Sequence, residues 1–122
     1  MAIAAAGAAV PAQAQAATNS TSSATVGCYA SGVSLKAFPG TSGTNAYWPS
    51  RGLYTEVQGY CNDINVKVAA TRDVRVCTRN KCHGWVTAKA GSWTVVFKNS
   101  TVGADYYLQF KGASTVNFVL AD

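Results

Sequence analysis

The chain has 122 residues, which is enough for one domain with its own hydrophobic core. Its hydrophobic share of 48% and charged share of 12% exclude a highly charged disordered protein, because such chains bury too little apolar surface to fold. The net charge of +5 is small and dispersed along the sequence, so we expect no nucleic-acid partner.

Residues 1–16 are expected to form a secretory signal peptide. The segment is rich in alanine, carries no charged side chain and ends in Ala14-Gln15-Ala16, which matches the small-residue pattern of a cleavage site. It is too short for a permanent membrane anchor, and an alanine-rich helix of the mature protein is the alternative. Because the basic region that normally precedes such a segment is missing, we expect the true start to lie further upstream. We therefore expect a secreted, extracellular protein with no membrane association after cleavage.

Residues 17–27 contain serine, threonine and alanine and no charge, which predicts a flexible N-terminal arm ahead of a single domain over residues 28–122. This arm either takes part in binding or serves only as a spacer.

Within residues 28–122, apolar and polar side chains alternate with the period of two that is typical of strands with one buried face. The inward positions of the main runs are Val33 and Leu35, Ile64, Val66 and Val68, Val74 and Val76, Trp93 and Phe97, Tyr106, Leu108 and Phe110, and Val116, Phe118 and Leu120. Turn signals separate the runs at Gly59, Arg72-Asp73, Gly91, Asn99 with Gly103, and Gly112. The pattern predicts an all-β protein, a small antiparallel β-sandwich or open barrel of six to eight strands.

Four cysteines in a small exported domain predict two disulfides. Cys77 and Cys82 flank a four-residue loop between two strand-like runs, where facing residues lie close enough to be bridged. This pairing leaves Cys28 with Cys61. If Cys77 faces Cys82, the register places Val74 opposite Trp85, so that Trp85 enters the core and His83 lies at its rim.

A zinc site at Cys77, Cys82 and His83 is the alternative use of these thiols, but one histidine and an oxidising compartment argue against it. We expect no metal and no other cofactor. We also expect no catalysis, because no spacing singles out a pair of carboxylates and no nucleophile motif accompanies His83.

Two groups of residues are candidates for partner binding. Arg72, Arg75, Arg79 and Lys81 cluster within ten residues and suit an acidic partner, although a solvated loop and an edge strand protected by charge explain them better. Several aromatic residues fall outside the expected core, and exposed tyrosine and tryptophan suit protein contact or sugar stacking. Partly covered core residues near the loop at 39–50 are the alternative. These aromatic residues are Tyr47, Trp48, Tyr54, Tyr60 and Tyr107. From both groups, the residues expected to bind a partner are Tyr47, Trp48, Tyr54, Tyr60, Arg75, Arg79 and Lys81.

Several strings resemble small secreted proteins with two disulfides from Streptomyces and related actinobacteria. These strings are Cys61-Asn-Asp-Ile-Asn-Val66, Val74-Arg-Val-Cys77, Trp93-Thr-Val-Val96 and Tyr107-Leu-Gln-Phe110. Some proteins of this kind are similar to adaptor subunits of umbrella-like antibacterial toxin particles. The resemblance implies a β-domain that links a lectin-like subunit to a toxin stalk.

The sequence therefore predicts a secreted, non-enzymatic β-domain that binds another secreted protein, as an adaptor does. A secreted inhibitor of a protease or glycosidase, with a disulfide-braced loop as a rigid wedge, is one alternative. A carbohydrate-binding module that uses exposed tyrosine and tryptophan is the other.

Overall fold

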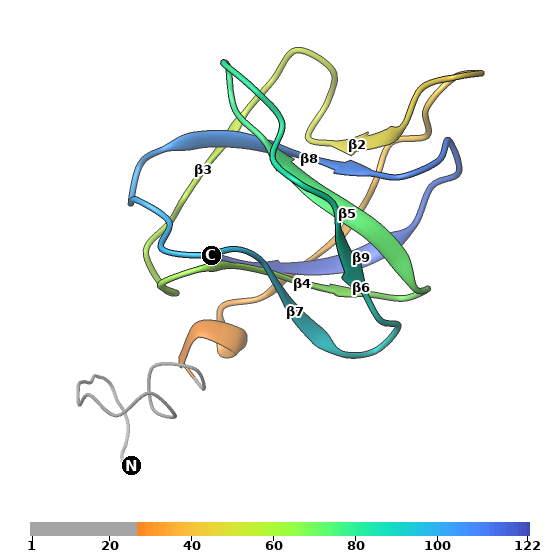
Figure 1. Cartoon of the computed structure of the whole chain (residues 1–122). Coiled ribbons are helices and arrows are strands. Elements are labelled where there is room, and N and C mark those ends of the chain that lie inside the picture. Colours follow the sequence, from red (N-terminus) through yellow and green to blue (C-terminus); the bar gives the residue numbers. More distant parts are fainter. Residues whose placement is uncertain (1–26) are drawn as a thin grey trace.

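The computed structural model describes residues 27–122, which form two antiparallel sheets packed face to face (Figure 1). The signal peptide expected at residues 1–16 and all of the expected arm except Gly27 lie outside the described residues. Residues 27–30 form a single helical turn that leads into the first sheet. The described part of the chain contains no helix long and apolar enough to cross a membrane.

The first sheet has the strand order β1-β9-β4-β7. Its strands are β1 (Val33–Lys36), β9 (Asn117–Ala121), β4 (Ile64–Val68) and β7 (Trp93–Phe97). The second sheet has the order β2-β8-β5-β6, and the short strand β3 also pairs with β8. Its strands are β2 (Ala46–Trp48), β8 (Asp105–Phe110), β5 (Arg72–Cys77), β6 (Val86–Ala88) and β3 (Thr55–Glu56).

This arrangement confirms the predicted all-β fold. Residues 27–122 form nine strands rather than six to eight, because β2, β3 and β6 have only two or three residues and show too little alternation to be recognised. Arg72 and Asp73, expected in a turn, begin β5. The Arg72 side chain donates hydrogen bonds to the carbonyl oxygens of Lys111, Gly112 and Ser114, which holds the loop between β8 and β9 against β5.

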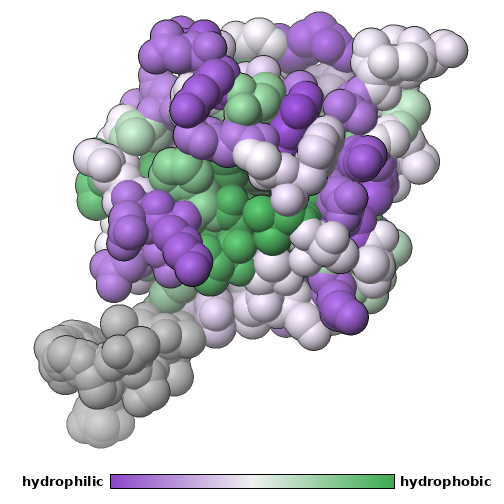
Figure 2. Space-filling view, in the orientation of Figure 1, coloured by the Kyte–Doolittle hydropathy of each residue, from purple (hydrophilic) through white to green (hydrophobic). Residues whose placement is uncertain are grey.

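The main hydrophobic core lies between the two sheets. The second sheet contributes Val74, Val76, Leu108 and Phe110, and the first contributes Ile64, Val66, Val68 and Phe118, all with exposed fractions of 3% or less. Figure 2 shows the apolar surface that remains visible where the two layers meet, surrounded by hydrophilic side chains. The inward positions of β4, β5 and β8 are therefore those predicted from alternation.

Both predicted disulfides are present, Cys28–Cys61 and Cys77–Cys82. Cys28 and Cys61 pack with Ala121 in a second, smaller cluster that also includes Tyr29 and Trp93. The Tyr29 and Trp93 rings are stacked, with their centroids 4.5 Å apart and their planes 2° from parallel. This cluster contains the long disulfide and fastens the first described residues to the sheet.

The expected core position of Trp93 was wrong. The pairing of β4 with β7 is irregular between Ile64 and Asn65, so Trp93 pairs with Lys67 while Phe97 pairs with the buried Ile64. Because one strand gains a residue there, Trp93 and Phe97 lie on opposite faces of the sheet. Phe97 packs against the main core, and Trp93 joins the second cluster.

The expected core position of Trp85 was also wrong. Cys77 does face Cys82, and the His83 amide donates to the Val76 carbonyl, but Val74 pairs with Val86 rather than with Trp85. The segment between Cys82 and β6 contains one more residue than the facing part of β5. Val86 therefore faces the core, and Trp85 lies on the outer face beside Arg75.

Candidate functional site

The outer face of the second sheet collects aromatic and basic side chains from five segments that are far apart in sequence. In β8, Tyr106, Leu108 and Phe110 are buried, so Tyr107 and Gln109 point outward. Cross-strand pairing places Tyr47 and Arg75 on either side of Gln109. We call this surface the aromatic-cation face. It comprises Tyr47, Tyr54, Trp85 and Tyr107 together with Arg51, Arg75, Arg79 and Lys111.

Each of the three arginines lies over an aromatic ring. The guanidinium carbon is 4.3 Å from the ring centroid for Arg51 over Tyr47, 4.3 Å for Arg75 over Trp85 and 4.1 Å for Arg79 over Tyr54. The Lys111 ammonium is 5.8 Å from the same Trp85 ring. Cation–π contacts of this kind restrict the long side chains, so they retain less conformational entropy than freely solvated arginines.

The positive charge of this face is only partly neutralised. Arg79 donates to the Asp105 carboxylate at 2.9 Å, which is the only salt bridge within residues 27–122. This hydrogen bond raises the pKa of the Arg79 guanidinium above its usual value. Arg75 donates from Nε to the Gln109 side chain at 2.8 Å, and its two terminal nitrogens take no part in this hydrogen bond. Arg51, Arg75 and Lys111 therefore have no carboxylate partner in the described part of the chain.

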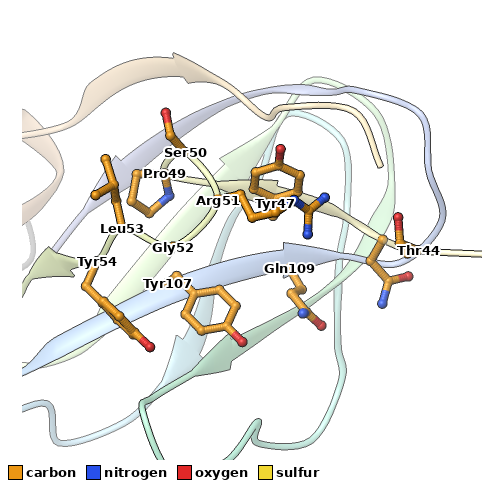
Figure 3. A pocket seen from close by; sticks show the side chains of 11 residues that line it. Thr44, Tyr47, Pro49, Ser50, Arg51, Gly52, Leu53, Tyr54, Tyr107 and Gln109 are labelled. Carbon is orange, nitrogen blue, oxygen red and sulfur yellow. The ribbon is translucent and has the colours of Figure 1, made fainter. Parts of the chain in front are cut away.

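A pocket of about 430 Å³ lies at one end of the aromatic-cation face, under the segment that joins β2 to β3. Figure 3 shows Tyr54, Tyr107 and Gln109 on one side of it, with Tyr47 and Arg51 opposite. The Tyr54 and Tyr107 rings meet edge to face with their centroids 5.6 Å apart. Asn45 also lines the pocket. Three phenol rings and two side-chain amides give it flat apolar walls with hydrogen-bonding groups at their edges.

The structure places four of the seven candidate binding residues, Tyr47, Tyr54, Arg75 and Arg79, on the aromatic-cation face. Lys81 lies nearby in the exposed loop of the Cys77–Cys82 hairpin. Trp48 does not belong to this group, because it turns inward and its ring meets Phe118 edge to face. Tyr60 is 65% exposed and lines a different groove, beside β1.

Four members of this face are not among the residues expected from the sequence to bind a partner: Arg51, Trp85, Tyr107 and Lys111. Tyr107 was recognised as outward-facing, and its place opposite Cys77 follows once β5 and β8 are known to pair. Trp85 was assigned to the core because the extra residue before β6 was not detected. Arg51 carries no local signal, since it lies in an irregular segment whose position depends on Tyr47.

A buried carboxyl lies next to the inward-facing Tyr106 of β8. Asp122 is 6% exposed and accepts a hydrogen bond from the Tyr106 hydroxyl at 2.5 Å. Burial raises the pKa of the Asp122 carboxyl above its ordinary value, and the hydrogen bond from Tyr106 only partly opposes this effect. Burial and the same carboxyl also raise the pKa of the Tyr106 hydroxyl.

Asp122→Asn is expected to stabilise the protein at neutral pH. Because the pKa of Asp122 is higher in the folded than in the unfolded chain, the folded state binds more protons between these two values, and stability falls as the pH rises through that window. The amide keeps an oxygen that accepts from Tyr106 and does not ionise. Thermal unfolding from about pH 3 to pH 8 should show equal midpoints at low pH and a higher midpoint for the variant at neutral pH. A variant that melts lower at every pH would contradict this assignment.

Comparisons with protein-family models, with curated proteins and with solved structures found no match to this chain. Within residues 27–122, no group of three or more His, Cys, Asp and Glu side chains is placed to hold a metal ion.

Proposed function

We propose that this protein is a secreted, non-enzymatic module that binds another secreted protein through the aromatic-cation face. The observation that carries the proposal is the ordered array of four aromatic rings and four cations on one sheet face, with a single carboxylate neutralising one of them. Tyrosine, tryptophan and arginine are the residues that dominate binding energy at protein interfaces. The unneutralised cations favour a partner surface that carries carboxylates.

Two features support secretion. The domain contains two disulfides, and disulfides persist in oxidising compartments. Residues 1–16 have the composition of a signal peptide. Short strings resemble small secreted actinobacterial proteins, some of which are similar to adaptor subunits, so a lectin-like or toxin-stalk subunit encoded nearby is the first partner to test.

Charge reversal of the face tests the proposal. Arg51→Glu with Lys111→Glu changes two exposed cations that contact Tyr47 and Trp85. Lys89→Glu with Lys98→Glu is the matched control, because both residues are exposed, lie outside this face and give the same change in net charge. Affinity purification from the culture supernatant of the source organism should recover the same partner with the parent and the control, and at least about tenfold less with the face variant, since like charges at an interface cost several kcal/mol. Equal recovery by all three proteins would contradict the proposal.

A second candidate function is carbohydrate binding, which the pocket beside Tyr54, Tyr107 and Gln109 favours. Its phenol rings suit stacking on a sugar ring, and the amides of Gln109 and Asn45 suit hydrogen bonds to hydroxyls. Retention on insoluble cellulose or chitin distinguishes the two functions. A sugar-binding module should be retained, and Tyr107→Ala should lose that retention, whereas the protein-binding module should flow through both.

A further inference from the structure

Over the first half of β1, no strand pairs with the backbone groups on the side that faces away from β9. The Ala37 amide donates to the Val116 carbonyl, and Leu35 and Val33 continue this pairing with Phe118 and Leu120 of β9. Since successive residues of a strand direct their backbone groups to opposite sides, Ser34 and Lys36 direct their N–H and C=O groups away from β9. Within residues 27–122, neither residue has a backbone partner on that side.

The same edge already accepts a strand at its other end. Phe38 and Tyr47 exchange both backbone hydrogen bonds, at 2.8 and 3.0 Å, and so join the end of β1 to β2. The chain then leaves this edge at Pro49, which has no N–H to donate. The next strand of the second sheet is β3, which has only two residues. The two sheets are therefore connected near Phe38 and stay apart beside Ser34.

A groove of about 540 Å³, lined by both apolar and polar side chains, lies in this opening between the sheets. Val33, Leu35, Trp48 and Leu120 form its apolar lining. Its polar lining comes from Ser31, Thr55, Gln58, Tyr60 and Asp122. Val33 pairs with the buried Leu120 and faces the interior of the sandwich, yet it is 56% exposed because no strand covers it. An inward-facing side chain that remains exposed marks a place where the core is not closed.

We infer that the open edge of β1 and this groove bind an extended segment of a partner protein by strand addition. The backbone of the segment pairs with Ser34 and Lys36, and its alternate apolar side chains enter the groove against Val33, Leu35 and Trp48. The side chains between them point outward beside the exposed Lys36, which favours an acidic residue there. The site is separate from the aromatic-cation face, so one domain would hold two partners, as an adaptor requires.

Ser34→Pro tests the backbone contact directly. Proline removes the outward N–H of residue 34 but leaves the pairing of Val33 and Leu35 with β9, and proline is tolerated on an edge strand with its nitrogen facing away. Ser34→Ala is the matched control, since it removes the hydroxyl and keeps the N–H. Val33→Asp tests the groove by placing a charge at its exposed mouth, with Val102→Asp, 68% exposed, as its control.

The probe is a phage-displayed library of random decapeptides selected on the purified protein. We expect enrichment of sequences with alternating apolar residues and no proline. An enriched peptide, made synthetically, should protect the Ser34 and Lys36 amides from hydrogen exchange. Its affinity should fall about tenfold or more in Ser34→Pro and Val33→Asp and stay unchanged in both controls.

Three results would overturn the inference. The first is that no such peptide is enriched, and the second is that the enriched peptides bind Ser34→Pro as tightly as Ser34→Ala. The third is that the Ser34 and Lys36 amides of the free protein are already protected, because another part of this chain would then occupy the edge. Circular dichroism of each variant confirms that the fold is intact, and the groove variant keeps the test decisive if the proline variant does not fold.

Discussion

Val76→Asp is expected to leave the protein unfolded at neutral pH. Val76 points from β5 into the main core, pairs with Leu108 and is 2% exposed. Removing its side chain from the core costs about 1.5–3 kcal/mol, and burying an unpaired carboxylate costs several kcal/mol more. The sum approaches the total stability of an ordinary domain, about 5–15 kcal/mol. Circular dichroism and amide NMR spectra should show loss of the cooperative transition and of chemical-shift dispersion.

Val102→Asp is the matched control for this substitution. Val102 lies in the turn before β8 and is 68% exposed, so the same change of atoms buries no charge there. Its free energy of unfolding should stay within about 0.5 kcal/mol of the parent. If both variants unfold, or if neither does, the assignment of Val76 to the inward face of β5 is incorrect.

Loss of the Cys28–Cys61 disulfide is expected to destabilise the protein by about 4 kcal/mol in the chain-entropy model, because the bond closes a loop of 33 residues. Loss of Cys77–Cys82, with a separation of 5 residues, should cost only about 2 kcal/mol by the same model. The long bond also joins the helical turn at residues 27–30 to the cluster of Ala121, Tyr29 and Trp93. Its removal therefore also loosens packing that the short bond does not support.

Denaturant unfolding of two variants measures this difference. One variant carries Cys28→Ala and Cys61→Ala, and the other carries Cys77→Ala and Cys82→Ala, so each loses both sulfurs and leaves no free thiol. The first should unfold at a clearly lower denaturant concentration than the second. The reverse order would mean that packing around the buried Cys77, rather than loop length, decides the contribution of each bond.

The strands that run through the centre of each sheet could be predicted from the sequence. Val74 and Val76 in β5 and Tyr106, Leu108 and Phe110 in β8 alternate with polar residues, and all five are buried as expected. Central strands have neighbours on both sides and one buried face, so their sequence follows the period of two without interruption. The short strands β2, β3 and β6 lack this signal, because two or three residues cannot show a period.

The aromatic-cation face could be predicted only in part. Tyr47, Tyr54, Arg75 and Arg79 were expected to be accessible, and the structure brings them together on one surface. Their proximity could not be derived, because Tyr47 and Arg75 meet only through Gln109 of β8, which lies more than thirty residues after Arg75. Contacts between distant strands depend on strand order, and alternation within one strand carries no information about its neighbours.

The sequence by itself determined the all-β class, the inward face of the central strands and the Cys77–Cys82 pairing, because each depends on local period or spacing. The Cys28–Cys61 pairing then followed by elimination. Only the tertiary structure decided which of Trp85 and Val86 enters the core. Val74, Ala88 and Phe110 are fully buried around that position, where valine fits better than the larger tryptophan. The extra residue therefore lies in the segment before β6. That shift turns Trp85 outward onto Arg75 and completes the aromatic-cation face. The open edge of β1 likewise depends on where β2 leaves it, which no pattern within β1 records.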